Sequence, residues 1–146
     1  MIELVFVIVI LGILSAVAIP KIMATRDDAK VAAMSQSIST AATEVASYAV
    51  SSGRVESDMA QMSNAITTMI KQGKASQPDM NVTAVDFQMG DVTDCITMEV
   101  DDGVMDANLT VSYGTAWGDR LCENLQSIFD DSKYPIPLTE IGRAHV

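Results

Sequence analysis

The chain has 146 residues, of which 49% are hydrophobic and 19% charged, and its formal net charge at pH 7 is −10. A chain this acidic repels nucleic acid, and its single histidine, His145, offers little for acid–base catalysis. No phosphate-binding glycine loop and no nucleophile with a recognisable base is present, so we expect no enzyme, catalytic residue, cofactor or metal site.

The first element is an apolar run over residues 4–20, which contains no charged side chain and directly follows Glu3. As a helix the run spans about 25 Å, slightly less than the ~30 Å hydrocarbon core of a bilayer, and its neighbours can extend it. Because the run is apolar on all sides, only lipid or other apolar helices can cover it. Glu3 needs a cation if it is buried there, since an unpaired buried charge is strongly destabilising.

Three interpretations of this run are open. A signal peptide would end at Ala16-Val17-Ala18, but the segment before the run carries Glu3 and no basic residue. An ordinary single-pass anchor would place the rest of the chain in the cytoplasm, because Lys21, Arg26 and Lys30 follow the run. The two cysteines later in the chain argue against that compartment. The third interpretation is a helix that lies first in a membrane and later in a protein polymer.

The segment from Met1 to about Lys30 resembles the N-terminus of a type IV pilin, with the family's acidic residue at Glu3 and its helix proline at Pro20. The family's usual first two mature residues are missing before Met1. The resemblance implies a helical homopolymer in which Glu3 pairs with the N-terminal amine of a neighbouring subunit. Gly12 and Pro20 weaken the helix, which favours local stretching; the alternative is that they only kink a membrane helix.

The resemblance also implies a fold, a location and partners. The fold is α+β, with a long N-terminal helix packed on a small antiparallel sheet. The subunit would lie in the bacterial inner membrane before assembly and then in an extracellular pilus. Its partners would be other copies of itself, the prepilin peptidase and the pilus assembly machinery, and the mature N-terminus would be methylated.

The helical pattern continues after Pro20 and ends at Ser51-Ser52-Gly53, because glycine commonly follows the last helical turn. Apolar residues recur there at spacings of three and four, which predicts one buried stripe: Val31, Met34, Ile38, Ala41, Val45 and Tyr48. We expect residues 1–25 to form the membrane or filament-core helix and residues 26–53 its amphipathic continuation. The charges at residues 26–30 are either a solvated run or intersubunit pairs.

Residues 54–146 form the predicted head, which is large enough for one small core. The pattern predicts a helix at 57–71, strands at 82–89, 95–100 and 109–113, and a helix at 119–129. The segment with Pro135 and Pro137 is expected to be an edge or a loop.

Cys95 and Cys122 are the two cysteines, and in an exported head they favour a disulfide that adds about 3 kcal/mol. The alternative is two free buried thiols in a cytosolic protein. The bridge resembles the C-terminal disulfide of many type IV pilins. It weighs against a pseudopilin of a type II secretion system, which usually lacks it.

From residue 75 to residue 119 the chain has nine acidic residues and no Lys or Arg. A solvated acidic coat is the simpler interpretation. The alternative is a calcium site, for which oxygen ligands are suitable, although no EF-hand spacing is present. Its ligands would come from Asp91, Asp94, Asp101, Asp102 and Asp106.

Two smaller features complete the sequence-based hypotheses. Asn81 and Asn108 each lie in a sequence that looks like a bacterial N-glycosylation site, although chance matches are common in such a chain. Tyr113 and Trp117 are expected in the core, and an adhesive patch is the alternative. The leading function is a structural pilus subunit. The alternatives are a pseudopilin and a single-pass membrane-anchored binding module.

Overall fold

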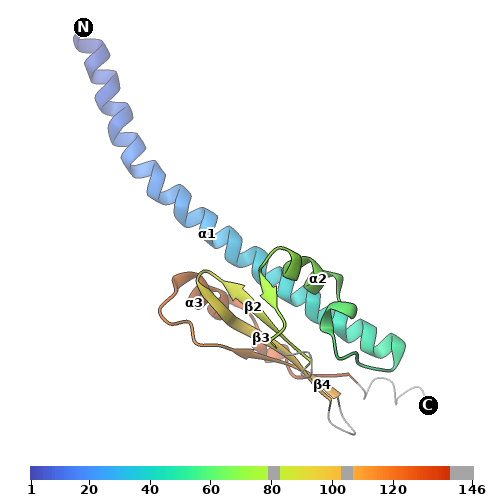
Figure 1. Cartoon of the computed structure of the whole chain (residues 1–146). Coiled ribbons are helices and arrows are strands. Elements are labelled where there is room, and N and C mark those ends of the chain that lie inside the picture. The colour runs from blue at the N-terminus through green and yellow to red at the C-terminus, as the bar shows by residue number, and fades with distance from the viewer. Residues whose placement is uncertain (79–82, 103–106, 139–146) are drawn as a thin grey trace. The chain divides into compact units, whose positions relative to one another are not determined.

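The chain folds as one long helix followed by a five-stranded antiparallel sheet, so the predicted α+β fold is confirmed (Figure 1). The computed structural model describes residues 1–78, 83–102 and 107–138. The chain divides into two compact units, Met1–Lys30 and Val31–Val146, and each is described by itself.

Helix α1 covers Ile2–Ser52 and passes through Gly12 and Pro20 as a single helix. In the first unit, every described side chain from Met1 to Ile22 is exposed. The helix ends at Ser52, and Gly53 follows with a φ of 69°, in the left-handed conformation that glycine adopts without steric cost. The predicted end of the helix is therefore confirmed.

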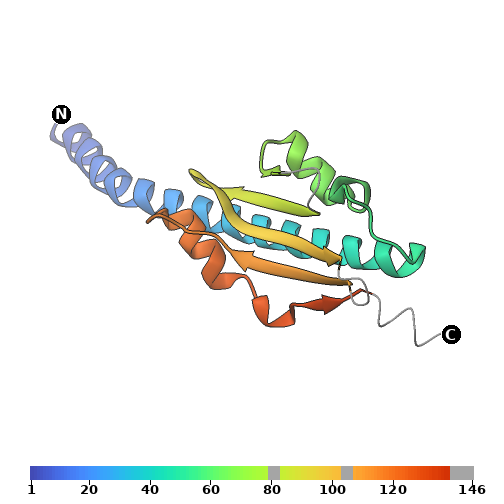
Figure 2. The ribbon, with the colours of Figure 1, turned by 60° about the horizontal axis from the view of Figure 1, so that its bottom comes forward.

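In the second unit, α1 lies along one face of the sheet (Figure 2). The predicted stripe is buried from Val31 to Val45, and Tyr48 is half-buried. Ala42 and Ala49 are buried as well, and these small side chains allow the helix to lie close to the strands.

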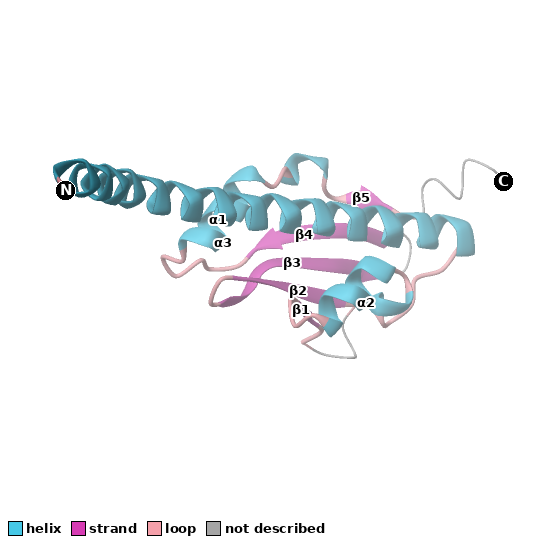
Figure 3. Ribbon diagram, turned by 90° about the horizontal axis from the view of Figure 1, so that it is seen from above, coloured by secondary structure: helices cyan, strands magenta, loops and turns pink. Residues whose placement is uncertain are grey.

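The strand order is β1-β2-β3-β4-β5, and every neighbouring pair is antiparallel (Figure 3). The strands are β1 Ala75–Ser76, β2 Ala84–Met89, β3 Val92–Asp102, β4 Ala107–Tyr113 and β5 Ile136–Pro137. In the register Met98 lies opposite Val85 on one side and Val111 on the other. This alignment places apolar side chains next to one another on the covered face.

The two faces of the sheet differ in polarity. On β3, Ile96, Met98 and Val100 are buried, whereas Glu99 and Asp101, on either side of Val100, are exposed. Such alternation is typical of an antiparallel sheet with one face in solvent.

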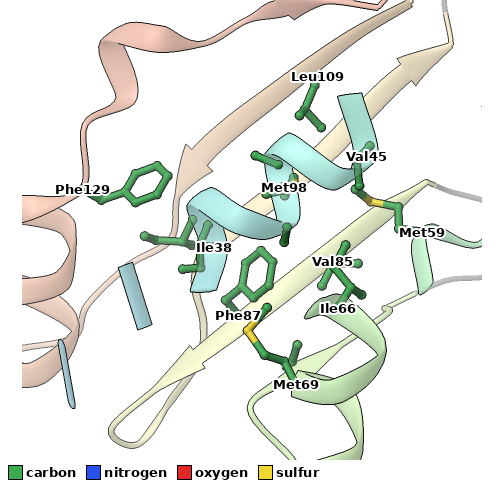
Figure 4. Packing of buried hydrophobic residues seen from close by; sticks show 14 of the residues in the cluster. Ile38, Val45, Met59, Ile66, Met69, Val85, Phe87, Met98, Leu109 and Phe129 are labelled. Carbon is green, nitrogen blue, oxygen red and sulfur yellow. The ribbon is translucent and has the colours of Figure 1, made fainter. Parts of the chain in front are cut away.

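One hydrophobic cluster joins α1, the sheet and the smaller helices (Figure 4). Ile38 and Val45 of α1 and Phe87 and Met98 of the sheet are fully buried. Met59, Ile66 and Met69 close the cluster from the side of α2, which covers Asn64–Lys71. Flexible methionine side chains suit this irregular boundary between helix and sheet.

The structure differs from the sequence prediction in the helix at 57–71 and in the strands. The helix predicted at 57–71 is two pieces, a 3-10 turn η1 at Met59–Gln61 and helix α2. The break arises because Asp58 and Ser63 each cap a separate element through their side chains. Strands β3 and β4 are longer than predicted, and the two-residue strand β1 was not predicted at all.

The C-terminal part of the described head contains helix α3, Arg120–Ile128, a 3-10 turn η2 at Asp131–Lys133 and the edge strand β5. Strand β5 pairs only with β4, through Leu109 and Asn108. Pro137 is tolerated there because an edge strand leaves one side without ladder hydrogen bonds.

Candidate assembly segment and head pocket

Glu3 lies in the first turn of α1 and is exposed. Within the described ranges its carboxylate has no ion-pair partner. A carboxylate in the first helical turn interacts favourably with the helix dipole, which is worth only about 0.3–1 kcal/mol at an exposed site. Glu3 is therefore free to pair with a cation outside the chain.

The apolar surface around Glu3 is continuous. Phe6 is 65% exposed, and Leu4, Ile8, Leu11 and Leu14 are exposed to a similar degree. By length and composition α1 is able to cross a membrane, although a signal sequence passes the same test. An apolar surface of this size needs a cover of lipid or protein.

The other predicted assembly residues lie within α1. A Cβ atom added at Gly12 would meet no atom within 4 Å, so the space beside this glycine is open in the isolated chain. Pro20 is part of the helix, and its side chain lies outside the described atoms.

In the charged segment, Lys30 pairs with Asp27 at 3.5 Å on the exposed surface. Intersubunit pairing of this segment stays a prediction.

In the head, a disulfide joins Cys95 of β3 to Cys122 of α3, with 5.7 Å between the Cα atoms. Both cysteines are fully buried. Gln126 strengthens the same connection, because its side-chain amide donates to the carbonyl oxygens of Cys95 and Gly114, each at 2.9 Å. Helix α3 is therefore fixed to the middle of the sheet by covalent and polar contacts.

Asp119 connects the turn between β2 and β3 to the start of α3. One carboxylate oxygen accepts hydrogen bonds from the backbone N–H groups of Leu121 and Cys122, at 2.9 and 3.0 Å. The other oxygen accepts from the backbone N–H of Asp91 at 3.1 Å. These bonds, led by the one from Cys122, lower the pKa of the Asp119 carboxyl group, which stays ionised at neutral pH.

The prediction that Tyr113 and Trp117 lie in the core is wrong. Trp117 is 83% exposed, and Tyr113 is 39% exposed, with its hydroxyl donating to the carbonyl oxygen of Phe129 at 3.0 Å. The aromatic core positions are occupied by Phe87 and Phe129 instead. Trp117 lies in the loop before α3 with a φ of 53°, a conformation that is rare for a bulky side chain.

Trp117 lines an open pocket of about 740 Å³, which we call the Trp117 pocket. Its walls are residues 91–94, which start at the β2–β3 turn, and residues 116–121, which lead into α3. Sequence reasoning missed this pocket, because the hydrogen bond that brings the two segments together joins Asp91 and Asp119, which are 28 residues apart. The sequence does contain one local signal for this region. Asp119 lies at the start of a predicted helix, and an Asp at that position is typical of an N-cap.

The remaining sequence-based candidates are distributed over the head. Asp91, Asp94 and Asp101 are exposed, and Asp106 lies outside the described residues, as does the side chain of Asp102. Among the described residues, no three potential ligands are close enough to hold a metal ion. Asn81 is also outside the described residues. Asn108 lies half-buried in β4, opposite Asp101 and Pro137.

Comparison of the chain with family models, curated proteins and solved structures finds no match. The pilin-like character therefore rests on the N-terminal residues and on the architecture: a long apolar helix, a small antiparallel sheet and a disulfide.

Proposed function

We propose that this chain is the structural subunit of an extracellular type IV pilus and that it polymerises through its N-terminal helix. The observation that supports this proposal most directly is that every described apolar side chain from Met1 to Ile22 is exposed. Each leucine- or isoleucine-sized side chain left in water forgoes about 1.5–3 kcal/mol of burial. Transfer of this segment from water into an apolar environment is therefore strongly favourable.

The proposal gives this segment two environments in succession. In the bacterial inner membrane, lipid covers the helix after the prepilin peptidase has acted. In the pilus, the assembly machinery transfers the helix into a bundle of identical helices, which present the same apolar side chains to one another. The proposal assigns no enzymatic activity and no nucleic-acid binding to this subunit alone.

Glu3 has the most specific role in the proposal. Its burial in the bundle would be costly unless a cation neutralises it, and the N-terminal amine of a neighbouring copy is the cation in the right part of the bundle. The pair forms only at one axial offset between two copies, so it sets the register. Gly12 and Pro20 provide the local adaptability that packing of the bundle requires.

Two other functions use the same segment. A pseudopilin of a type II secretion system would also polymerise, and a single-pass membrane-anchored binding module would not. The disulfide between Cys95 and Cys122 favours the pilus subunit, since the resemblance associates this bridge with pilins.

The test compares Glu3→Ala with Glu123→Ala, which removes the same charge from an exposed position in α3. Sheared cell-surface material is imaged by electron microscopy, and the thermal unfolding of each head is measured. We expect the native chain and Glu123→Ala to form long filaments. Glu3→Ala should form none although its head unfolds at the native temperature. Normal filaments from Glu3→Ala would refute the assigned role, and absence of long filaments from the native chain would favour the pseudopilin or the anchored module.

A further inference from the structure

We propose that the Trp117 pocket binds an organic cation, an alkylammonium or guanidinium group, between the indole of Trp117 and the carboxylates of Asp91 and Asp94. This site is separate from the assembly segment, and it does not depend on the proposed pilus function.

The first argument is the exposure of a tryptophan beside a pocket. Trp117 is 83% exposed, whereas Phe87 and Phe129 are buried. The indole left in water forgoes the free energy that burial would give, and a ligand in the adjoining pocket would recover part of it. The indole face carries negative charge density, and tryptophan is the best of the aromatic side chains at attracting a cation.

The second argument is charge. Three carboxylates and one guanidinium, that of Arg120, line the pocket, so its formal charge is negative. Asp119 already uses both of its oxygens to accept backbone hydrogen bonds. The exposed carboxylates of Asp91 and Asp94 have no ion-pair partner in the part of the chain that the structure describes. They therefore remain available to a ligand, and they disfavour an anionic one.

The third argument is that the walls of the pocket are held in place before a ligand arrives. The Asp119 carboxylate fixes Asp91, and the disulfide joins Cys95 and Cys122, which directly follow the lining residues Asp94 and Leu121 in the chain. Gly114 lies so close to the backbone carbonyl of Asp94 that a Cβ atom would not fit. A preformed pocket loses little conformational entropy on binding, which improves affinity. Its volume of about 740 Å³ is within the range of small-molecule sites.

The cation has two sources with the same chemistry. It is either a free small organic cation or the Lys or Arg side chain of another protein, which includes a second copy of this chain. In either case, the group that lies against the indole is an organic cation, either weakly hydrated or able to donate hydrogen bonds.

Trp117 is the only tryptophan of the chain, so intrinsic fluorescence reports on this pocket alone. The full chain, kept in a neutral detergent, is titrated with tetramethylammonium chloride, with the neutral isostere tert-butyl alcohol and with sodium chloride. A further titration uses N-acetyl-arginine amide. We expect saturable changes with the organic cations and none with the alcohol or the sodium salt.

Variants test the two carboxylates together and the indole by itself. The double variant Asp91→Asn/Asp94→Asn should lower the affinity for the organic cations at least tenfold. The control Asp130→Asn removes an exposed carboxylate elsewhere in the head and should leave the affinity unchanged. Trp117→Ala, followed by calorimetry, should abolish binding.

Tighter binding of tetramethylammonium would indicate a free ammonium ligand, and tighter binding of the arginine derivative would indicate a protein side chain. The proposal is overturned if the native chain responds equally to the cation and its neutral isostere, or responds to neither organic cation. This comparison needs no variant, so it remains decisive even if a variant does not fold.

Discussion

Glu44 of α1 accepts a hydrogen bond of 2.6 Å from the hydroxyl of Ser63, the residue that caps α2. The same carboxylate oxygen accepts from the backbone N–H of Ala65 at 3.0 Å, and the Ser63 hydroxyl accepts from the N–H of Ile66. Two backbone donors at the start of α2, which would otherwise lack partners, are thus satisfied by α1 and by the cap together. The contact fixes α2 against the long helix.

Replacement of Glu44 should therefore destabilise the head. Glu44→Ala removes two hydrogen bonds to an ionised group and leaves the hydroxyl of the buried Ser63 without its acceptor, and we expect a loss of about 2 kcal/mol in the free energy of unfolding. Gln36→Ala, at an exposed position of the same helix, is the control and should change stability by less than about 0.5 kcal/mol. Urea unfolding followed by circular dichroism measures both. Equal stabilities of the two variants would contradict the role of Glu44.

The stability of the head should fall in acid. Hydrogen bonds lower the pKa of Glu44 below its ordinary value of 4.5, chiefly the one from Ala65. The pKa values of Asp58 and Asp119 are also lowered, from an ordinary value of 3.8, chiefly by Gln77 and by the backbone of Cys122 respectively. A lowered folded-state pKa means that the unfolded chain binds protons first. The stabilisation is complete above the ordinary values and is lost as the pH falls through the folded-state values.

This pH dependence is measured by urea unfolding at pH values from about 6 down to about 3. The variant Glu44→Gln cannot lose a charge at this position, so its stability should decline less over that interval than the stability of the native chain. A native head whose free energy of unfolding stays constant below pH 4.5 would contradict the prediction.

The parts of the fold that could be predicted from the sequence are those with a strong local period. The stripe from Val31 to Val45 repeats over several turns, so its burial follows from the pattern alone. The alternation in β3 and the glycine after α1 are equally local signals. The break between η1 and α2 could not be predicted in this way, since apolar spacing continues across Ser63 while the capping side chains interrupt the helix.

The candidate pocket was less accessible to sequence reasoning for a different reason. The size of Trp117 suggests a core residue, yet its side chain is exposed. The loop backbone is left-handed at this residue, and the aromatic side chains in the core are those of Phe87 and Phe129. The contacts that build the pocket connect residues far apart in the chain, such as Asp91 and Asp119. Glu3, by contrast, was identified from its position before an apolar run, and its role awaits the filament test.

The disulfide should contribute substantially to the stability of the head. It links Cys95 and Cys122, which are 27 positions apart, and closing a loop of this length restricts the unfolded chain by about 3 kcal/mol. Urea unfolding with and without a reductant measures this difference. The double variant Cys95→Ser/Cys122→Ser is the control, because its stability should be low and indifferent to the reductant. A native head that is equally stable in both conditions would show that the bridge contributes little.

Gly114 should be intolerant of any side chain. A Cβ atom at this position would overlap the backbone carbonyl oxygen of Asp94, and a backbone atom within a paired strand cannot move aside as a flexible side chain would. We expect Gly114→Ala to lose at least ~2 kcal/mol of stability, as overpacking does elsewhere. It should also weaken binding of organic cations in the Trp117 pocket, because Asp94 must shift. Gly12→Ala, where the space is open and the residue lies in the other unit, should leave the melting of the head unchanged. If the head of Gly114→Ala has the same melting temperature as the native head, β3 and the loop after β4 are not in such close contact.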